Sequence, residues 1–310
     1  MLDFQPVDLS IKELVDSYTF KYGEGSCQHS FVSSFCLNHK YGDMFCEHDD
    51  YLYTLRSKKS DDSERVYLFP HGDRNNPEAM RHAIQNVIDD AHEHNAKVKF
   101  ETLTLSAKYI VLANFPGMFT CETSEDYTEY VYSVDRQIDL NHWGLRNRRQ
   151  KIHRFFRDYG NRCKILNIEP EHIPLIREYQ SKWLRYKLES KERSPHYIDA
   201  ITTDNAAIQV ALDHFFELGL FGIVLFIDGK VCGYEYGSRL SDTFCDSMEE
   251  KGDTQFRSIT RVLNQEFINR FCQNMHYINV EEDVGIEGIR EKKHFDAPDI
   301  MIEKYILREV

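Results

Sequence analysis

Apolar and polar positions in the first hundred residues follow the two-residue period of strands, interrupted by one helical stretch. Runs rich in β-forming residues at 51–55 and 65–69 flank a polar turn, which predicts a β-hairpin. The segment 77–95 begins with a proline and places apolar residues at helical spacing. An alternating run follows at 98–105. Strands, a helix and another strand predict an α/β or α+β domain with a mostly antiparallel sheet.

The clearest pattern of the second half lies at 222–237. Two β-rich runs there flank Asp228-Gly229, and such a dipeptide is the strongest short signal for a hairpin. Residues 120–134, rich in Tyr and Thr, predict a strand between the two halves. The other elements expected after it are helices over 170–186, 203–218 and 257–271, and strands over 163–168, 244–248, 276–278 and 300–307.

Composition favours two domains over one. The chain has 310 residues, of which 41% are hydrophobic and 29% charged, and it contains 18 Tyr and 20 Phe. This many aromatic residues argues against disorder, and the length exceeds what a single core usually needs. The composition changes sharply after the Tyr-rich strand, so we expect domains at 1–135 and 136–310.

The sequence predicts a cytoplasmic protein. No apolar run reaches the roughly 18 residues that cross a bilayer, and the first residues lack the pattern of a signal peptide. Eight cysteines occur without CxxC spacing, which indicates reduced thiols. A metal site is an alternative that matches no common zinc pattern, so we predict none; it would use Cys27, Cys36, Cys46, His29, His39 and His48.

Positive charge is concentrated in one segment, although the net charge is −13. Residues 142–164 contain eight Lys or Arg and a single acid, Asp158, with apolar residues at about helical spacing. One interpretation is a solvated basic helix. The other is an anion site for the phosphates of a nucleotide, a lipid head group or tRNA. The candidate anion-binding residues are Arg146, Arg148, Arg149, Lys151 and Arg154.

Acidic residues cluster where the strand at 276–278 ends. Glu281, Glu282 and Asp283 come in a row, followed by two glycines and a basic run. Open α/β sheets bind ligands at the carboxyl ends of their strands, so these residues are candidates for chemistry; a solvated acidic turn is the structural alternative. Because side chains alternate along a strand, at most two of the three can face one pocket. Further candidates are Glu250 as a carboxylate and Lys251, Arg290 and Lys293 as cations.

The same stretch carries a family resemblance. The pattern N-x-E-E-D-x-G-I-E-G-I-R-x-x-K at 279–293, with Pro298 and Glu303-Lys304-Tyr305 after it, resembles the end of the phosphatidylglycerol lysyltransferase C-terminal family. The likeness is strongest from about Gly144 onward. It implies tandem GNAT-like acyltransferase domains with mostly antiparallel mixed sheets flanked by helices, the first a degenerate copy. The family includes stand-alone proteins of unknown function, and has a similar basic segment.

The loop at 251–258 weakens an assignment to coenzyme A chemistry. In acetyl-CoA enzymes of this fold, a glycine-rich loop presents backbone N–H groups to the pyrophosphate. Here the loop has one glycine, and the bulky Phe256 would crowd a pyrophosphate. The aminoacyl-tRNA-dependent branch also departs from that loop, which agrees better with the basic segment.

We therefore predict an acyltransferase-like protein without a tightly bound cofactor. Its expected donor is aminoacyl-tRNA, with acyl-CoA less favoured, and its acceptor is an amine or a hydroxyl. The acidic residues would act as bases or bind the donor's ammonium, and the cations would stabilise the oxyanion. An inactive binding protein that holds a nucleotide, RNA or protein partner on its basic face is the alternative, and a CoA-dependent N-acetyltransferase is the third. No DNA partner and no membrane span are predicted, and the lone His71 and His142 are expected to be structural.

Overall fold

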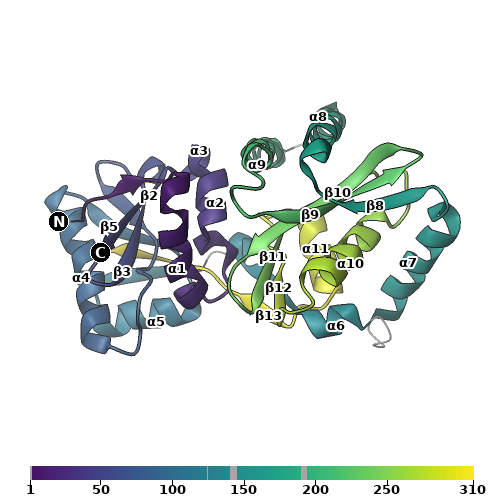
Figure 1. Cartoon of the computed structure of the whole chain (residues 1–310). Helices are drawn as coiled ribbons and strands as arrows, with labels where there is room; N and C mark the ends of the chain where they lie inside the picture. Colours follow the sequence, from purple (N-terminus) through teal and green to yellow (C-terminus); the bar gives the residue numbers. More distant parts are fainter. Residues whose placement is uncertain (1, 124, 140–144, 190–193) are drawn as a thin grey trace. The chain divides into compact units, whose positions relative to one another are not determined.

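The computed structural model describes residues 2–123, 125–139, 145–189 and 194–310, which form two compact units (Figure 1). Unit 1 comprises Met1–Tyr130, Glu282–Asp296 and Ile300–Val310. Unit 2 comprises Val131–Glu281 and Ala297–Asp299. The chain thus leaves the first unit five residues before the expected boundary at 135/136, and its end returns there instead of staying in one domain over 136–310. Residues 142–144 of the basic segment, including His142, and 190–193 lie outside the described residues.

Unit 1 is built on a seven-stranded sheet with the order β1-β2-β3-β4-β5-β14-β6. The parallel pairing of β4 with β5 is bridged by α4, and the other neighbours in the sheet are antiparallel. The strands are β1 (Gln5–Pro6), β2 (Asp43–His48), β3 (Tyr51–Arg56), β4 (Glu64–Tyr67), β5 (Lys97–Leu103), β6 (Phe119–Thr123) and β14 (Tyr305–Glu309). The helices are α1 (Lys12–Tyr22), α2 (Phe31–Cys36), α3 (Asn38–Tyr41), α4 (Pro77–Glu93), α5 (Leu105–Asn114), α11 (Glu287–Phe295) and the short 3₁₀ helix η2 (Cys27–His29).

Local sequence explains α4, and a buried side chain explains why the C-terminus returns to unit 1. The side chain of Asn76 accepts a hydrogen bond from the Ala79 amide, and Pro77 occupies the first helical turn, where a missing N–H costs nothing. At the other end of the chain, Leu307 pairs with Phe100 of β5 on one side and with Cys121 of β6 on the other. Leu307 is fully buried in the core of this sheet. The apolar residue therefore has its burial site in the first sheet.

The second sheet has the order β13-β7-β12-β11-β10-β9-β8. The predicted hairpin is confirmed, because β9 and β10 pair around Asp228 and Gly229, both at positive φ. The predicted strand over 120–134 is instead two strands, β6 and β7, that belong to different sheets. The strands are β7 (Glu129–Ser133), β8 (Cys163–Asn167), β9 (Phe221–Ile227), β10 (Lys230–Arg239), β11 (Phe244–Gly252), β12 (Tyr277–Asn279) and β13 (Ile300–Ile302).

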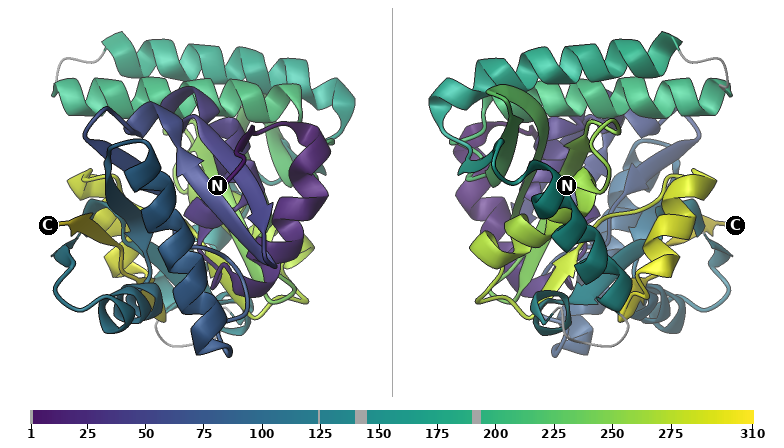
Figure 2. Two further views of the ribbon diagram at one scale, coloured as in Figure 1. Left: turned by 90° about the vertical axis from the view of Figure 1, so that its left-hand side faces the viewer. Right: turned by 90° about the vertical axis from the view of Figure 1, so that its right-hand side faces the viewer.

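Helices cover both faces of this sheet. The long helices α8 and α9 lie side by side and pack on one face, where Tyr234 of β10 donates a hydrogen bond to Gln180 of α8 (Figure 2). Helix α10 packs on the other face, against Gly233 and Gly237, with α7 beside it. The helices of unit 2 are α6 (Val134–Ile138), α7 (Arg146–Tyr159), α8 (Ile173–Glu189), α9 (Pro195–Asp213) and α10 (Ile259–Phe271).

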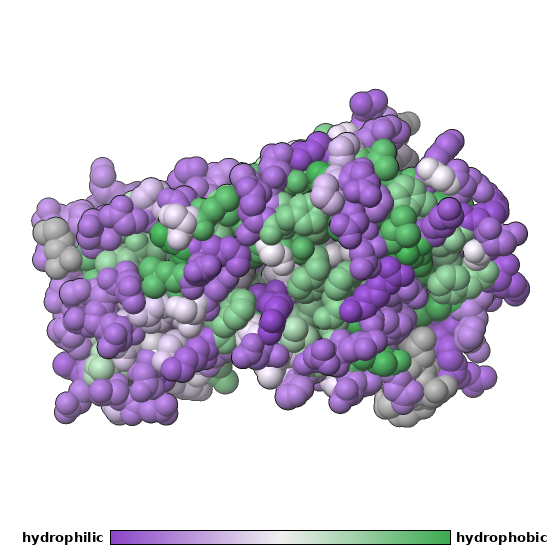
Figure 3. All heavy atoms as spheres, in the orientation of Figure 1, coloured by the Kyte–Doolittle hydropathy of each residue, from purple (hydrophilic) through white to green (hydrophobic). Residues whose placement is uncertain are grey.

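Hydrophilic residues dominate the face of the molecule shown in Figure 3, with apolar residues in small patches between them. Within the described part of the chain, no helix combines the length and the apolar character needed to cross a bilayer.

Candidate active site

The sheet of unit 2 opens where β11 separates from β12. The two strands pair in parallel only from Phe244↔Tyr277 to Asp246↔Asn279, while β11 continues to Gly252. A bulge follows at once, because Gly237 of β10 faces Ser247 and its neighbour Tyr236 faces Glu249, which leaves Met248 as the extra residue. Bulges bend strands and re-aim side chains, often beside active sites. The stretch of β11 after the bulge is therefore the place to look for chemistry.

Glu249 and Lys251 share the face of β11 that α8 and α9 cover. Their partners on β10 are Tyr236 and Tyr234, and these two buried tyrosine rings stack on that face. Glu250 lies between them in sequence and faces Glu235, so its side chain is on the opposite, α10 side. The two neighbouring candidates Glu250 and Lys251 thus lie on opposite faces of the sheet.

A cluster of two carboxylates and one ammonium forms on the α8–α9 face. Lys251 Nζ lies 2.9 Å from Asp204 Oδ2 of α9 and 2.7 Å from Glu249 Oε2. The ammonium also stands 4.7 Å from the ring centre of Trp183 of α8. The side chain of Glu249 is 10% exposed, whereas that of Asp204 is 36% exposed. The cluster is therefore buried at Glu249 and open to solvent at Asp204.

The environment pushes the pKa values of the two carboxyl groups apart. Burial, followed by the charge of Asp204, raises the pKa of Glu249 well above its ordinary range. Burial also acts to raise the pKa of Asp204, but the charge of Lys251 and hydrogen bonds from Glu249 and Lys251 outweigh it and lower that pKa. A proton shared by the pair is therefore favoured on Glu249, and the negative charge on Asp204. Such a divided pair suits one group as acid and the other as base.

Sequence reasoning missed Glu249 and Asp204. Glu249 directly follows the strand predicted over 244–248, and Asp204 is a single acid within a helix. One signal is present, because Glu249 and Lys251 stand two residues apart, so that in a strand continued past 248 their opposite charges point to one face. Nothing along the chain indicated that α9 would bring Asp204 to them.

The acidic turn after β12 is divided between the units. Glu281 belongs to unit 2, where its amide donates to Asn279 Oδ1 at 2.8 Å, and Glu282 and Asp283 belong to unit 1. Asp283 is fully buried and accepts hydrogen bonds from Tyr130 OH, the Gly285 amide and Arg290, whose Nε and Nη2 lie 2.7–2.8 Å from its oxygens.

Arg290 and Lys293 hold the turn and α11 together. Arg290 also pairs with Asp126 at 2.8 Å, and Lys293 Nζ donates to the carbonyl oxygen of Glu282 at 2.5 Å. Glu282 is half-buried with Oε2 at 3.9 Å from Cys27 Sγ; burial and the charge of Glu129 raise its pKa. These contacts engage Asp283, Arg290 and Lys293 within the turn and α11, and the chemical roles expected of them stay predictions.

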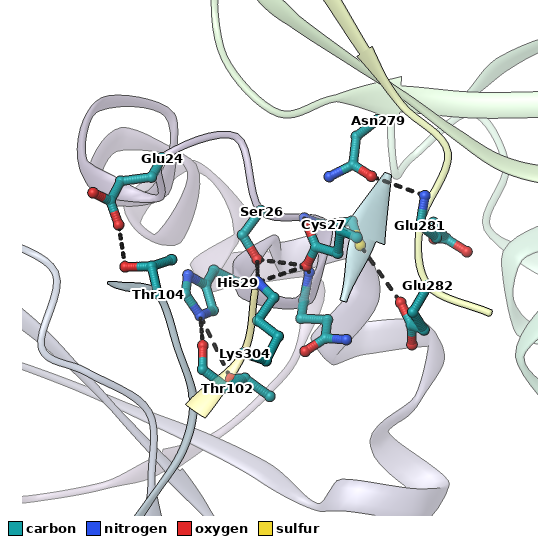
Figure 4. A network of polar contacts seen from close by, with 12 residues as sticks. Glu24, Ser26, Cys27, His29, Thr102, Thr104, Asn279, Glu281, Glu282 and Lys304 are labelled. Atoms are coloured by element: carbon teal, nitrogen blue, oxygen red, sulfur yellow. Dashed lines mark hydrogen bonds and ion pairs between the residues drawn. The ribbon is translucent and has the colours of Figure 1, made fainter. Parts of the chain in front are cut away.

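A buried ion pair anchors the C-terminal segment of unit 1. Lys304 Nζ lies 2.7 Å from Glu129 Oε1 and donates to Ser26 Oγ at 2.6 Å, and both charged side chains are fully buried. Glu129 also accepts from Ser26 Oγ at 2.8 Å and from the Cys27 amide at 3.2 Å. Figure 4 shows Lys304, Ser26 and Cys27 converging at this point. The Glu303-Lys304-Tyr305 part of the sequence resemblance therefore corresponds to a structural anchor.

The predicted basic helix exists as α7, but its cations do not form one surface. Arg148 is only 6% exposed, and its guanidinium donates to Gln137 and, at 2.6 Å, to Asn264 Oδ1. Asn264 in turn donates to Glu235, which is also buried. Arg148 thus shares the inner face with Ile152 and Phe155, at helical spacing, and is not available to bind a solvent anion. Arg146 and Arg154 are exposed, and Arg149 and Lys151 are half-buried.

The loop at 251–258 is shaped by packing. Gly252 approaches α10 so closely that an added Cβ would lie 2.7 Å from Ile259 Cγ2 and 2.9 Å from Thr260 Cγ2. Phe256 makes an edge-to-face contact with Tyr159 of α7, with 5.3 Å between ring centres. The one glycine of this loop is therefore required by helix packing, and the expectation that the loop disfavours coenzyme A stays a prediction.

In unit 1, two histidines lie beside the point where the parallel strands β4 and β5 stop pairing. The parallel pairing of β4 and β5 ends at Tyr67↔Phe100. His29 Nε2 then lies 3.0 Å from the Thr102 carbonyl oxygen, and its ring stands 5.0 Å from that of His71, which follows β4. Both histidines are buried, as expected for a structural His71. Unit 2 keeps its polar cluster at the equivalent place, so the candidate site lies there.

Three solved structures show where this architecture recurs. Neither a family model nor a curated protein matches the sequence. A conserved protein of unknown function from Bacteroides thetaiotaomicron VPI-5482 superposes with a TM-score of 0.91 at 23% identity, over 100% of both chains. The C-terminal domain (DUF2156) of a putative lysylphosphatidylglycerol synthetase from Agrobacterium fabrum has a TM-score of 0.66 at 11% identity, over 98% of this chain and 93% of its own. FemX has a TM-score of 0.64 at 8% identity, over 100% and 98%.

At these identities the similarity establishes the fold. The expected class of tandem GNAT-like domains with mixed sheets is confirmed, because these neighbours match the whole chain and the order strand, helices, three strands, helix, strand occurs twice, from β1 to β5 and from β8 to β12. The resemblance noted at 279–293 agrees with the likeness to the DUF2156 domain. The chain thus shares an acyltransferase-like fold with FemX and with the DUF2156 domain of a putative lysylphosphatidylglycerol synthetase.

Proposed function

We propose that this protein transfers an aminoacyl group from aminoacyl-tRNA to an amine or hydroxyl acceptor, at the site in unit 2. The observation that carries the proposal is the cluster of Asp204, Glu249 and Lys251 on the part of β11 that has separated from β12. The fold shared with FemX and with a putative lysylphosphatidylglycerol synthetase supports acyl transfer.

The divided carboxyl pair suits the proton transfers of this reaction. The acceptor's nitrogen or oxygen attacks the ester carbonyl carbon, and its proton passes to the charged Asp204. Lys251 stabilises the negative oxygen of the tetrahedral intermediate. The bond between the carbonyl carbon and the ribose oxygen then breaks, and Glu249 gives its proton to that leaving oxygen. Asp204 returns its proton to Glu249 through their hydrogen bond, which restores the starting state.

The predicted donor agrees with the surroundings of the site. The loop at 251–258 is closed by Phe256 and Gly252 against α7 and α10, which disfavours a coenzyme pyrophosphate. Arg146 and Arg154 on the exposed side of α7 are suited to phosphate contacts, with Arg149 and Lys151 beside them. Glu281 remains the predicted partner for the ammonium of the aminoacyl group, and Glu250 remains a predicted carboxylate without an assigned step.

The test is aminoacyl transfer by the purified protein, with labelled aminoacyl-tRNAs as donors and a panel of amines and hydroxyl compounds as acceptors. Asp204→Asn and Glu249→Gln should each lower the transfer rate about 100-fold or more, the usual loss when a general acid or base is removed. Binding of charged tRNA should stay within a factor of two to three. Asp199→Asn, a control on an exposed position of the same helix, should leave the rate unchanged. Equal rates in all four proteins would refute the assignment.

A binding protein without catalysis is the second candidate. It is supported by unit 1, where the buried rings of His29 and His71, and not an acid–base pair, lie beside the end of the β4–β5 pairing. That candidate predicts a rise in the unfolding midpoint with uncharged and charged tRNA alike, and no transfer to any acceptor. A rise with acetyl-CoA alone would instead support the N-acetyltransferase alternative.

A further inference from the structure

Two buried thiols meet in unit 2. Cys245 lies at the start of β11, and Cys272 directly follows α10. Their sulfur atoms are 3.0 Å apart, and both residues are fully buried. Because a disulfide bond is about 2.05 Å long, the sulfurs need to approach by only about 1 Å to become bonded.

Regular structure holds both cysteines in place. Cys245 faces Arg239 of β10 on one side and Ile278 of β12 on the other. The Cys272 amide donates to the carbonyl oxygen of Ile268 at 3.0 Å, which caps α10. A strand of a paired sheet and the end of a packed helix thus bring the thiols together, so the contact is a property of the core of unit 2.

We propose that Cys245 and Cys272 are a site of reversible oxidation and form an intramolecular disulfide with a small disulfide oxidant such as oxidised glutathione. One cysteine, as its thiolate, attacks a sulfur of the oxidant and releases one glutathione thiolate. The second cysteine loses its proton, attacks the resulting mixed disulfide and releases the other. The two protein thiols are oxidised, and one oxidised glutathione is reduced to two glutathione molecules.

Burial determines when this reaction takes place. An oxidant cannot reach a fully buried sulfur in the closed fold, so the first attack requires local opening or an unfolded chain. The bond would close the segment 246–271, which carries Glu249, Lys251 and the loop at 251–258. Oxidation during folding would therefore lock both ends of the segment that carries the candidate site. This inference does not depend on the proposed function.

The experiment is to refold the reduced wild-type protein in buffers with increasing ratios of oxidised to reduced glutathione. Remaining thiols are alkylated, and the peptides are mapped by mass spectrometry without reduction. We expect one cross-linked peptide that joins Cys245 to Cys272 and a rise of the unfolding midpoint by roughly 5–10 °C, reversed by dithiothreitol.

Two variants and a matched control complete the design. Cys245→Ser and Cys272→Ser should lose both the cross-link and the rise in midpoint, whereas Cys121→Ser, at an exposed position, should keep both. Alkylation of all eight cysteines in the wild type at every glutathione ratio would overturn the proposal. So would a cross-link that joins Cys245 or Cys272 to another cysteine. Both outcomes are read on the wild type, so neither depends on a variant that folds.

Discussion

Replacing Lys304 by methionine removes the cation at the centre of the anchor in unit 1. Methionine keeps the length and the apolar stem of the side chain and loses only the ammonium. Glu129 would then remain fully buried, with hydrogen bonds from Ser26 Oγ and the Cys27 amide but without its counter-ion. Lys304 and Glu129 both have no exposed area, so water cannot replace the lost partner.

The expected loss is about 3–5 kcal/mol of unfolding free energy, the usual result of removing one partner of a buried ion pair. Most of this loss is the cost of the charge left behind on Glu129. A second substitution, Glu129→Gln, removes that charge and keeps one oxygen, which can accept from either Ser26 Oγ or the Cys27 amide, since these two donate to different oxygens of Glu129. The double variant should therefore recover part of the stability that Lys304→Met loses. Lys97→Met, at an exposed position of β5, should change stability by less than about 0.5 kcal/mol.

The two units must be measured separately. Both tryptophans, Trp143 and Trp183, fall within the segment Val131–Glu281 of unit 2, so their fluorescence reports mainly on that unit. Hydrogen exchange followed by mass spectrometry resolves unit 1, and Lys304→Met should lower protection in peptides from β5 and β14. A loss below about 1 kcal/mol, or a double variant less stable than Lys304→Met, would refute the view that the uncompensated charge dominates.

Three further predictions follow from individual contacts. Arg148→Met should destabilise unit 2 by about 2–4 kcal/mol, as measured by urea unfolding, because the amide oxygens of Gln137 and Asn264 lose the donor that Arg148 supplies. By contrast, Arg146→Glu combined with Arg154→Glu should weaken tRNA binding and leave the unfolding free energy within about 0.5 kcal/mol of the wild type. Burial lowers the pKa of His71 to about 3 from its ordinary 6.5, so as the pH falls the unfolded chain takes up this proton before the folded chain does. The contribution of His71 to stability should be complete above pH 6.5 and fall as the pH drops towards 3. In urea titrations between about pH 4 and 7, His71→Asn should flatten this dependence. Gly252→Ala should lower the unfolding free energy by about 1–3 kcal/mol because its Cβ meets Ile259 and Thr260; a neutral effect in thermal unfolding would show that α10 moves aside without cost.

Local pattern was sufficient wherever neighbours in sequence decide the structure. The Asp228-Gly229 hairpin and the proline-led helix α4 form where their sequences predict them, since turn geometry and capping depend on adjacent residues. The family resemblance added the tandem acyltransferase-like fold. The local pattern also predicted that Arg148 lies on the cationic face of α7, which is wrong. Helical spacing identifies the buried apolar stripe of a helix, but it does not show which flanking residue is buried with that stripe.

Long-range packing decided the candidate site. The acids of the turn at 281–283 are prominent in sequence. In the folded chain, however, Asp283 is buried in unit 1 and accepts hydrogen bonds from Tyr130 and Arg290. Glu249 is a candidate for acid–base chemistry because a bulge in β11 precedes it and because α9 brings Asp204 to Lys251 beside it.

The sequence by itself determined most of the elements and the supply of charged groups, because these depend on residue type and local period, and its family resemblance added the fold class. Only the tertiary structure decided that the C-terminal strand completes the first sheet, that Lys304 is a buried anchor and that Lys251 pairs with Asp204 and Glu249. Those outcomes depend on where an apolar side chain such as Leu307 finds its burial site and on which charges are brought out of water together.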